Sequence, residues 1–254
     1  MSEQPEKKQI GDYLFDWKRK FDNFLFHYTA PLIIGVLILA FVIFAIVQCA
    51  GKKQGDANVA YVGPHEIGNE QFSELQSSLN KIVGEDLNGD NEIYVSFTRF
   101  LYMTERQMEN ARAAGKSVDS QAVMSAQTQV LLELKQGNII IYFIDLEVYK
   151  YLANRPEVFF MTLEESLGYT PENAYDECAV KLSDLPAGKY YMGLDSFPSN
   201  TIVTVRDMQP GEKGNKSKET LYESNLKTFR NLVKFKFPET ETTESTEDTK
   251  NTEE

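Results

Sequence analysis

Oxygen-bearing side chains alternate along one short segment of the chain and are its clearest candidates for metal ligands. They are Asp86, Asn88, Asp90 and Glu92. A calcium-binding loop requires oxygen ligands at alternate positions, which this spacing matches. The match fails at two positions. Asn91 stands where such a loop needs a glycine, and Phe97 stands where it needs a bidentate glutamate. Because Asn88-Gly89 is a strong turn signal, the segment predicts a plain turn, with a weak calcium site as the alternative.

Two further carboxylates, Asp145 and Glu147, follow the apolar run Ile139–Ile144. Open α/β sheets bind ligands beyond the carboxyl ends of their strands, so these side chains are candidates for a weak ligand site. An acidic side chain at the start of a helix also accepts backbone N–H groups and pairs with the helix dipole. We expect this capping role, with ligand binding as the alternative.

The sequence offers few residues for catalysis or for a metal centre built on histidine or cysteine. Two histidines, His27 and His65, and two cysteines leave few groups for a metal centre or a nucleophile. Cys178 has no marked histidine partner, and we expect it to pack as a small apolar residue. The sequence contains no G-x-S-x-G motif and no phosphate-binding glycine loop. We therefore expect no catalysis and no cofactor beyond the weak calcium possibility, with an envelope hydrolase as the least favoured alternative.

The net charge of the chain limits the kinds of macromolecule that it can bind. The chain carries 26 Lys and Arg against 38 Asp and Glu, a net charge of −12. Nucleic acids are bound by clustered basic surface, so this excess of acid argues against a nucleic-acid partner.

The elements that must position these side chains alternate between strand and helix patterns. Strands are predicted at residues 57–62, 93–98 and 139–144. Apolar residues at helical spacing indicate helices between them, around residues 72–82 and 123–134, and each helix is followed by a glycine. Two successive β-α-β units imply a parallel sheet. The run Ile139–Ile144 is apolar on both faces, which is typical of a central strand covered by helices on both sides.

The second half of this region is less regular. We expect a short helix at 146–153, strands at 190–194 and 201–205, and a last amphipathic helix from Tyr222 to Val233. Thr162 and Glu165 have the spacing of a capping box. The sequence thus predicts a single α/β domain over residues 57–237, with a mostly parallel sheet.

An uncharged apolar stretch precedes the domain. Tyr28 to Gln48 is 21 residues without a charge, and about 20 helical residues cross a bilayer core. We predict a transmembrane helix at 28–50, between an aromatic and basic leader at 1–27 and a polar linker at 51–56. Four Lys or Arg lie within twenty residues upstream and two downstream, which places the leader in the cytoplasm and the domain outside. Lipidation of Cys49 is an alternative anchor.

The chain after Phe237 contains nothing that could build a core. Residues 238–254 hold seven acidic side chains against one lysine, which predicts a disordered acidic tail. A solubilising role is the expected one, and docking through charge is the alternative.

Several of these features together resemble Firmicutes-type single-pass membrane proteins. They are the aromatic and basic leader, the single span, the acidic turn DLNGD before a strand, and the segment LLELKQGNIIIYFIDLEVYKYL. The last segment is also similar to one lobe of an extracellular solute-binding protein, with a helix, a turn at Gly137, a buried strand ending in Asp145 and a second helix. The outer domain has room for one such lobe and hardly for two, so the resemblance implies the lobe's fold more firmly than its ligand binding.

These expectations combine into a function. We expect a membrane-anchored extracytoplasmic binding or interaction module at the cell envelope, whose partners are the lipid bilayer and another envelope or membrane protein. A membrane-tethered solute-binding component of a transporter is the alternative, and only that function requires a small-molecule ligand.

Overall fold

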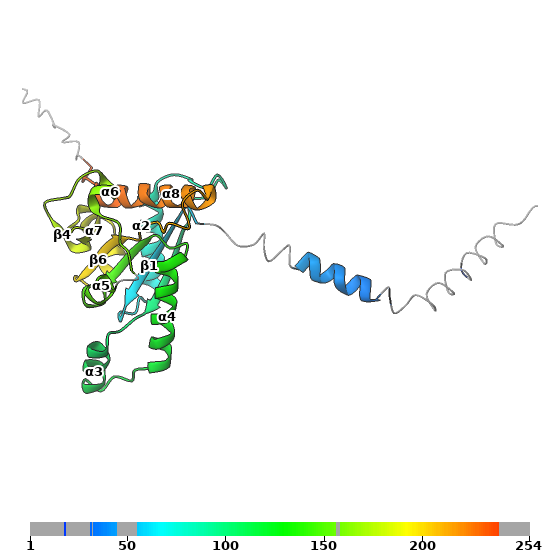
Figure 1. The fold of residues 1–254 in the computed structure, drawn as a ribbon, viewed down its shortest axis with the longest axis horizontal. Helices are drawn as coiled ribbons and strands as arrows, with labels where there is room; N and C mark the ends of the chain where they lie inside the picture. The colour runs from blue at the N-terminus through cyan, green and yellow to red at the C-terminus, as the bar shows by residue number, and fades with distance from the viewer. Residues whose placement is uncertain (1–17, 19–30, 32, 45–54, 156–157, 239–254) are drawn as a thin grey trace, which may run out of the picture. The chain divides into compact units, whose positions relative to one another are not determined.

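The computed structural model describes residues 18, 31, 33–44, 55–155 and 158–238 (Figure 1). The chain divides into two compact units, Met1–Lys53 and Gln54–Glu254. Cys49, nearly all of the predicted leader and residues 239–254 of the predicted tail lie outside the described residues.

In the first unit, residues 33–44 are helical. The large apolar side chains from Ile33 to Phe44 are between 45% and 73% exposed. The predicted span at 28–50 extends past this described segment at both ends. Among the helices that the structure describes, none combines the length and the apolar character needed to cross a membrane.

The second unit is an α/β domain built on one six-stranded sheet. Its strands are β1 (Ala57–Gly63), β2 (Val95–Leu101), β3 (Ile141–Asp145), β4 (Ala174–Asp176), β5 (Ala179–Lys181) and β6 (Thr201–Val205). The strand order is β2-β1-β3-β6-β5-β4. β1 pairs in parallel with β2 and β3, whereas β6 pairs antiparallel with β3 and β5, and β4 pairs antiparallel with β5. The predicted α/β class is confirmed, and the sheet is mixed, with its parallel part confined to the first three strands.

Four helices belong to the parallel half: α2 (Asn69–Val83), α3 (Glu105–Ala113), α4 (Ser120–Gln136) and α5 (Leu146–Ala153). α2 joins β1 to β2, α3 and α4 join β2 to β3, and α5 follows β3 directly. The predicted helices that correspond to α2, α4 and α5 are confirmed. The sequence pattern missed α3 because this helix buries none of its side chains and so has no apolar stripe. In Figure 1, α3 and the first turns of α4 project beyond the sheet.

The antiparallel half carries shorter elements, which are α6 (Leu163–Leu167), the 3-10 helix η1 (Leu182–Asp184), α7 (Pro186–Tyr190) and the 3-10 helix η2 (Leu194–Ser196), followed by α8 (Lys216–Val233). The predicted capping box is present, since Thr162 Oγ1 accepts from Glu165 N and the Glu165 carboxylate accepts from Thr162 N. The predicted last helix corresponds to α8, and it begins after the cap residue Asn215.

The predicted strand at 190–194 is wrong. Tyr190 ends α7, which begins with Pro186 at a position where the missing N–H of proline costs nothing. The chain then turns at Gly193, whose φ of 90° lies in the left-handed region. A Cβ atom at Gly193 would stand 2.5 Å from the backbone nitrogen of Leu75 in α2. Close packing against α2 therefore requires glycine here and forces a turn where the side-chain pattern suggested a strand.

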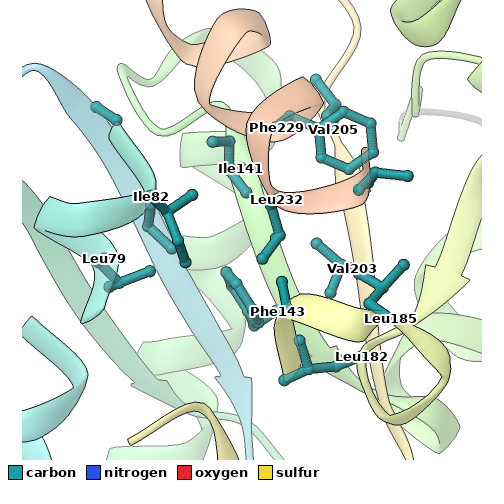
Figure 2. Close-up of a cluster of buried hydrophobic side chains, with 14 of the residues drawn as sticks. Leu79, Ile82, Ile141, Phe143, Leu182, Leu185, Val203, Val205, Phe229 and Leu232 are labelled. Atoms are coloured by element: carbon teal, nitrogen blue, oxygen red, sulfur yellow. The ribbon is translucent and has the colours of Figure 1, made fainter. Parts of the chain in front are cut away.

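Helices cover both faces of the sheet. On one face, side chains of α2, α6, α7 and α8 pack on β1, β3 and β6 in a large core cluster. Figure 2 shows this cluster, in which Phe229 and Leu232 of α8 lie over Ile141, Phe143 and Val205. On the other face, α4 and α5 pack on Ala60, Tyr142 and Ile144. Since β3 has neighbours on both sides and side chains buried on both faces, it is a central strand, as predicted.

The domain begins before its first strand. Gly55 and Asp56, which we assigned to the linker, are buried. The Asp56 carboxylate accepts hydrogen bonds from the backbone N–H groups of Leu87 (2.7 Å), Asn88 (3.0 Å) and Tyr94 (2.8 Å). These bonds tie the turn between α2 and β2 to the sheet, and β2 begins after Tyr94, two residues later than predicted.

Candidate functional site

The strand order creates a switch point between β1 and β3. From β1 the chain passes through α2 to β2 on one side, and it then returns through α4 to β3 on the other side. α2 and α4 cover opposite faces of the sheet. The connections that leave the carboxyl ends of β1 and β3 therefore diverge. In open α/β sheets, ligands bind in the crevice at this place.

Asp145 ends β3 at the switch point and is 5% exposed. Its Oδ1 accepts from the backbone N–H groups of Glu147 (3.0 Å) and Val148 (3.4 Å), so the predicted capping role is present at the start of α5. Two side-chain amides also reach it: Gln107 Nε2 donates to Oδ1 and Asn200 Nδ2 donates to Oδ2, each at 2.8 Å. Asp145 thus joins three segments that are distant in sequence.

Glu147 lies two residues further on, in the first turn of α5, and contacts the start of α3. It accepts hydrogen bonds from Thr104 Oγ1 and from Arg106, whose Nε is 3.2 Å from Glu147 Oε1. The hydrogen bond from Arg106 is the main reason that the pKa of Glu147 is lowered. The Arg106 side chain is 72% exposed, so the pair is a surface contact that holds the start of α3 against α5 and adds little stability.

A crevice of about 740 Å³ opens at this edge of the sheet, and we call it the edge crevice. Its lining includes Pro64, His65 and Glu66 after β1, Leu101 and Met103 at the end of β2, Gln107, Asn110 and Ala111 of α3, and Lys116 to Asp119 before α4. The segment from α3 to the start of α4 forms the outer wall. This volume lies in the range of small-ligand sites.

The outer wall changes our expectation for the ligand. The single lobe that the sequence predicts has no second lobe to enclose a small molecule, so its fold was implied more firmly than ligand binding. The unpredicted helix α3 supplies that wall, and Gln107 links it to Asp145 through its Nε2. Gln107 also accepts from Thr104 N through its Oε1, which completes a capping box for α3.

Three of the five buried side-chain polar atoms that lack a partner in the described part of the chain belong to residues near the carboxyl edge of the parallel strands. Among the described residues, His65 Nε2, the Tyr61 hydroxyl and Thr201 Oγ1 have no hydrogen-bond partner, although the His65 backbone lies close to the Tyr61 hydroxyl. Tyr61 and Thr201 are fully buried, and Thr201 pairs with Asp145 in the sheet register. Burial, and then the charge of Asp145, raise the pKa of Tyr61, so its hydroxyl stays protonated. Unpartnered buried groups of this kind are uncommon and carry a cost in stability.

Gly63 brings these groups together. It is the last residue of β1, next to β3. A Cβ atom on Gly63 would stand 2.6 Å from the Tyr61 hydroxyl oxygen and 3.0 Å from Asp145 Cβ. Only a residue without a side chain allows both groups to approach the backbone here.

The acidic turn lies at the opposite, amino edge of the parallel strands, because it connects the end of α2 to the start of β2. Asp86 accepts from the N–H groups of Gly89 (2.6 Å) and Asn91 (2.7 Å), and these backbone hydrogen bonds lower its pKa. Asn88 and Asp90 accept from the residues two positions further on. The predicted turn is confirmed, and the structure does not bring the acidic turn together with Asp145 and Glu147.

The remaining predicted groups are the calcium ligands and the Cys178 thiol. Across the described residues, no three His, Cys, Asp or Glu side chains are placed to hold a metal ion. The calcium site at Asp86 to Glu92 stays a prediction. Cys178 is half-buried, and burial together with nearby carboxylates, Asp176 first, raises its pKa to about 11. The thiol is therefore protonated near neutral pH and is a weak nucleophile.

Sequence reasoning missed Thr104, Gln107, Asn200 and His65 as members of the site. One signal was available, since Thr104 and Gln107 have the spacing of a capping box. The contacts of Asn200 and Gln107 with Asp145 span 55 and 38 residues and had no local signal. Comparison of the chain with protein-family models, with curated proteins and with solved structures finds no match in any of the three.

Proposed function

We propose that the protein is a membrane-anchored binding module at the cell envelope, whose α/β domain lies outside the cytoplasm and binds its ligand in the edge crevice. The observation that carries the binding function is the crevice at the carboxyl edge of the parallel strands, which is lined by residues that follow β1 and β2 and is linked to the end of β3 by the hydrogen bond from Gln107 to Asp145. The uncharged stretch at 28–50 and the excess of positive charge before it support the anchor and its orientation.

The crevice is distant from the point where the chain enters the domain. The chain enters the domain at the amino end of β1, and the edge crevice lies at the carboxyl end of the same strand. Seven residues of strand span about 20 Å. The edge crevice and the point where the chain enters the domain are therefore at opposite ends of β1.

The uncharged polar side chains that line the edge crevice favour an uncharged polar ligand. The amides of Gln107 and Asn110 and the hydroxyl of Ser117 can donate and accept hydrogen bonds. The buried carboxylate of Asp145 disfavours an anion beside it. Neutral groups that accept and donate hydrogen bonds, such as sugar hydroxyls or peptide amides, match this set.

A second function is favoured by the same crevice. A membrane-tethered solute-binding component of a transporter would also use a crevice of this size for a small polar solute. The two functions differ in what occupies the crevice, which is a segment of another envelope protein in the first and a free solute in the second. Intact-cell crosslinking from position 116, at the rim of the crevice, separates them.

The test is thermal unfolding of the full-length protein in detergent micelles with a panel of amino acids, dipeptides, monosaccharides and disaccharides. A ligand present at about 100 times its Kd stabilises the folded state by about 2.7 kcal/mol, which raises the melting temperature by several degrees. We expect such a shift for at least one class of the panel if the occupant is a solute, and a crosslinked envelope protein if it is not.

Two variants tie the result to the crevice. His65→Phe removes the unpartnered Nε2 from the wall while keeping an aromatic ring, and it should abolish the ligand-induced shift or the crosslink. Tyr142→Phe is the matched control, because it removes another unpartnered buried hydroxyl on a residue that does not line the crevice. If neither a shift nor a crosslinked partner is found, or if His65→Phe retains the full effect, the proposed site is wrong.

A further inference from the structure

A second hollow surface lies at the C-terminal ends of α2 and α8, away from the edge crevice. A groove of about 510 Å³ is lined by Lys81, Ile82, Gly84, Tyr191, Lys227, Arg230, Asn231, Lys234 and Phe235. An adjoining hollow of about 550 Å³ shares Lys81 and Tyr191 with it and adds Ser78, Tyr190 and Met192. We call the two together the α8 groove.

Aromatic side chains crowd one end of the α8 groove and stay accessible. Tyr190 is 46% exposed, Met192 is 72% exposed and Phe237 is 55% exposed. The Tyr190 ring lies 4.9 Å from Phe235 and 6.0 Å from Phe237, measured between ring centroids. Contiguous exposed apolar surface next to polar residues indicates an interaction site.

The rest of the groove is positively charged. Lys81, Lys227, Arg230 and Lys234 contribute four cations. Lys227 is paired with Glu85, whereas Arg230 Nε donates to Ser166 O and Lys234 Nζ to Leu167 O. Carbonyl groups do not cancel a charge, so the groove is basic although the chain as a whole carries −12. Its occupant should be acidic.

We propose that the α8 groove binds the chain's own acidic tail, residues 239–254. The tail has seven acidic side chains and one lysine and follows directly after Phe237 and Pro238, at the aromatic end of the groove. Its sixteen residues can extend about 50 Å, which is enough to reach every cation of the groove. A segment attached at the rim of its own site has an effective concentration in the millimolar range, so weak contacts suffice.

Docking in the groove would bring the carboxylates of the tail to the cations Lys81, Arg230 and Lys234. Because these pairs are exposed, salt screens them, and the tail leaves the groove as ionic strength rises. The tail then competes with any other acidic segment for this surface.

Carbodiimide crosslinking of the full-length protein tests the proposal, since it joins a lysine to a carboxylate only at contact distance. The products are digested and identified by mass spectrometry. We expect tail carboxylates to be linked to Lys81 and Lys234 about tenfold more often than to the exposed reference lysines Lys116 and Lys150, because docking concentrates the tail at the groove. High salt should remove most of this preference. The Lys227–Glu85 pair reports in the same sample that the reaction has worked.

Paired variants complete the experiment. Lys81→Gln together with Arg230→Gln should lower linking of the tail to Lys234, whereas the matched control Lys116→Gln should leave it unchanged. A mixture of heavy- and light-isotope chains shows whether the links lie within one chain. Equal linking to all exposed lysines, or links found only between different chains, would overturn the proposal, and the second result would assign the groove to the tail of another copy.

Discussion

The two edges of the parallel half of the sheet use a buried carboxylate in different ways. At the amino edge, Asp56 accepts three hydrogen bonds, all from backbone N–H groups of one loop. At the carboxyl edge, Asp145 accepts two from backbone N–H groups and two from the side-chain amides of Gln107 and Asn200.

The hydrogen bonds of Asp56 hold a loop in place, whereas the side-chain hydrogen bonds of Asp145 belong to the candidate site. Backbone N–H groups that are paired with a buried carboxylate fix the course of a loop and are not available to a ligand. Side-chain amides can rotate toward a ligand when one arrives. The amino edge also carries the buried Arg206–Glu212 pair, whose Nη atoms and carboxylate oxygens are 2.7 and 3.0 Å apart. Changes at the amino edge should therefore affect stability alone, and changes at the carboxyl edge should affect binding more than stability.

The largest effect is expected at the amino edge, for Glu212→Ala. The Arg206 side chain is 2% exposed and would keep its charge without a carboxylate partner. Breaking a buried pair in this way costs about 3–5 kcal/mol. Urea unfolding of the full-length protein measures the loss, and binding in the edge crevice should be unchanged under native conditions.

The same pair should make the domain sensitive to acid. Burial alone raises the pKa of Glu212, but hydrogen bonds from Arg206 and Gln209 N and the positive charges of Arg206 and Lys218 outweigh it, and the pKa is lowered from 4.5. The stabilisation is therefore complete above pH 4.5 and is lost as the pH falls through the lowered pKa. Urea midpoints measured between neutral pH and acid should fall less steeply for Glu212→Gln than for the natural chain.

The next effect is expected for Asp56→Asn, also at the amino edge. The asparagine oxygen can still accept from Leu87 and Asn88, but its NH₂ group would face the N–H of Tyr94. The buried N–H of Tyr94 is then left without an acceptor, and the hydrogen bonds from Leu87 and Asn88 are weakened because the oxygen no longer carries a negative charge. Together these losses cost about 3 kcal/mol. Hydrogen exchange of the Tyr94 amide should accelerate. Unchanged stability would mean that solvent reaches this edge.

A smaller effect on stability is expected for Asp145→Ala at the carboxyl edge. Loss of the helix cap costs about 0.5–2 kcal/mol, and the Gln107 and Asn200 amides are free to find water. Ligand binding or partner capture should be weakened much more than stability, because Gln107 in the outer wall of the edge crevice loses its hydrogen bond to the end of β3. Retained binding at unchanged affinity would show that Asp145 serves the cap alone.

The smallest effect is expected for Thr201→Val, which should raise the stability of the domain where the other variants lower it. Valine has nearly the shape of threonine and removes a buried hydroxyl that has no partner among the described residues. The domain should be stabilised by up to about 1 kcal/mol. A loss of stability would show that the hydroxyl has a partner such as an ordered water.

Local pattern predicted most of the fold. The alternation of apolar runs and helical stripes located β1, α2, α4, β3, α5, β6 and α8, because each buries a periodic set of side chains that the sequence displays. It failed for α3, which buries nothing, and for residues 190–194, where contact of Gly193 with α2 decides the course of the chain. The antiparallel strands β4 and β5 have three residues each and are too short to show a period.

The candidate site was predicted in part. Asp145 was placed correctly at the carboxyl end of a central strand, because the length of the apolar run marks both the strand and its end. Its partners Gln107 and Asn200, and the wall formed by α3, were not predicted. No pattern within a window of sequence reports a contact between side chains that lie 38 or 55 residues apart.

The sequence by itself determined where burial must occur: the apolar runs, the glycines that end helices, the α/β class and the position of Asp145. Only the tertiary structure decided the order of the strands, and with it the switch point between β1 and β3. The physical reason is that burial depends on the side chains within each element, whereas a site forms only where residues from different elements come together. The packing of the helices against both faces of the sheet decides which residues do so, and it brings His65, Gln107 and Asn200 to one edge of the sheet.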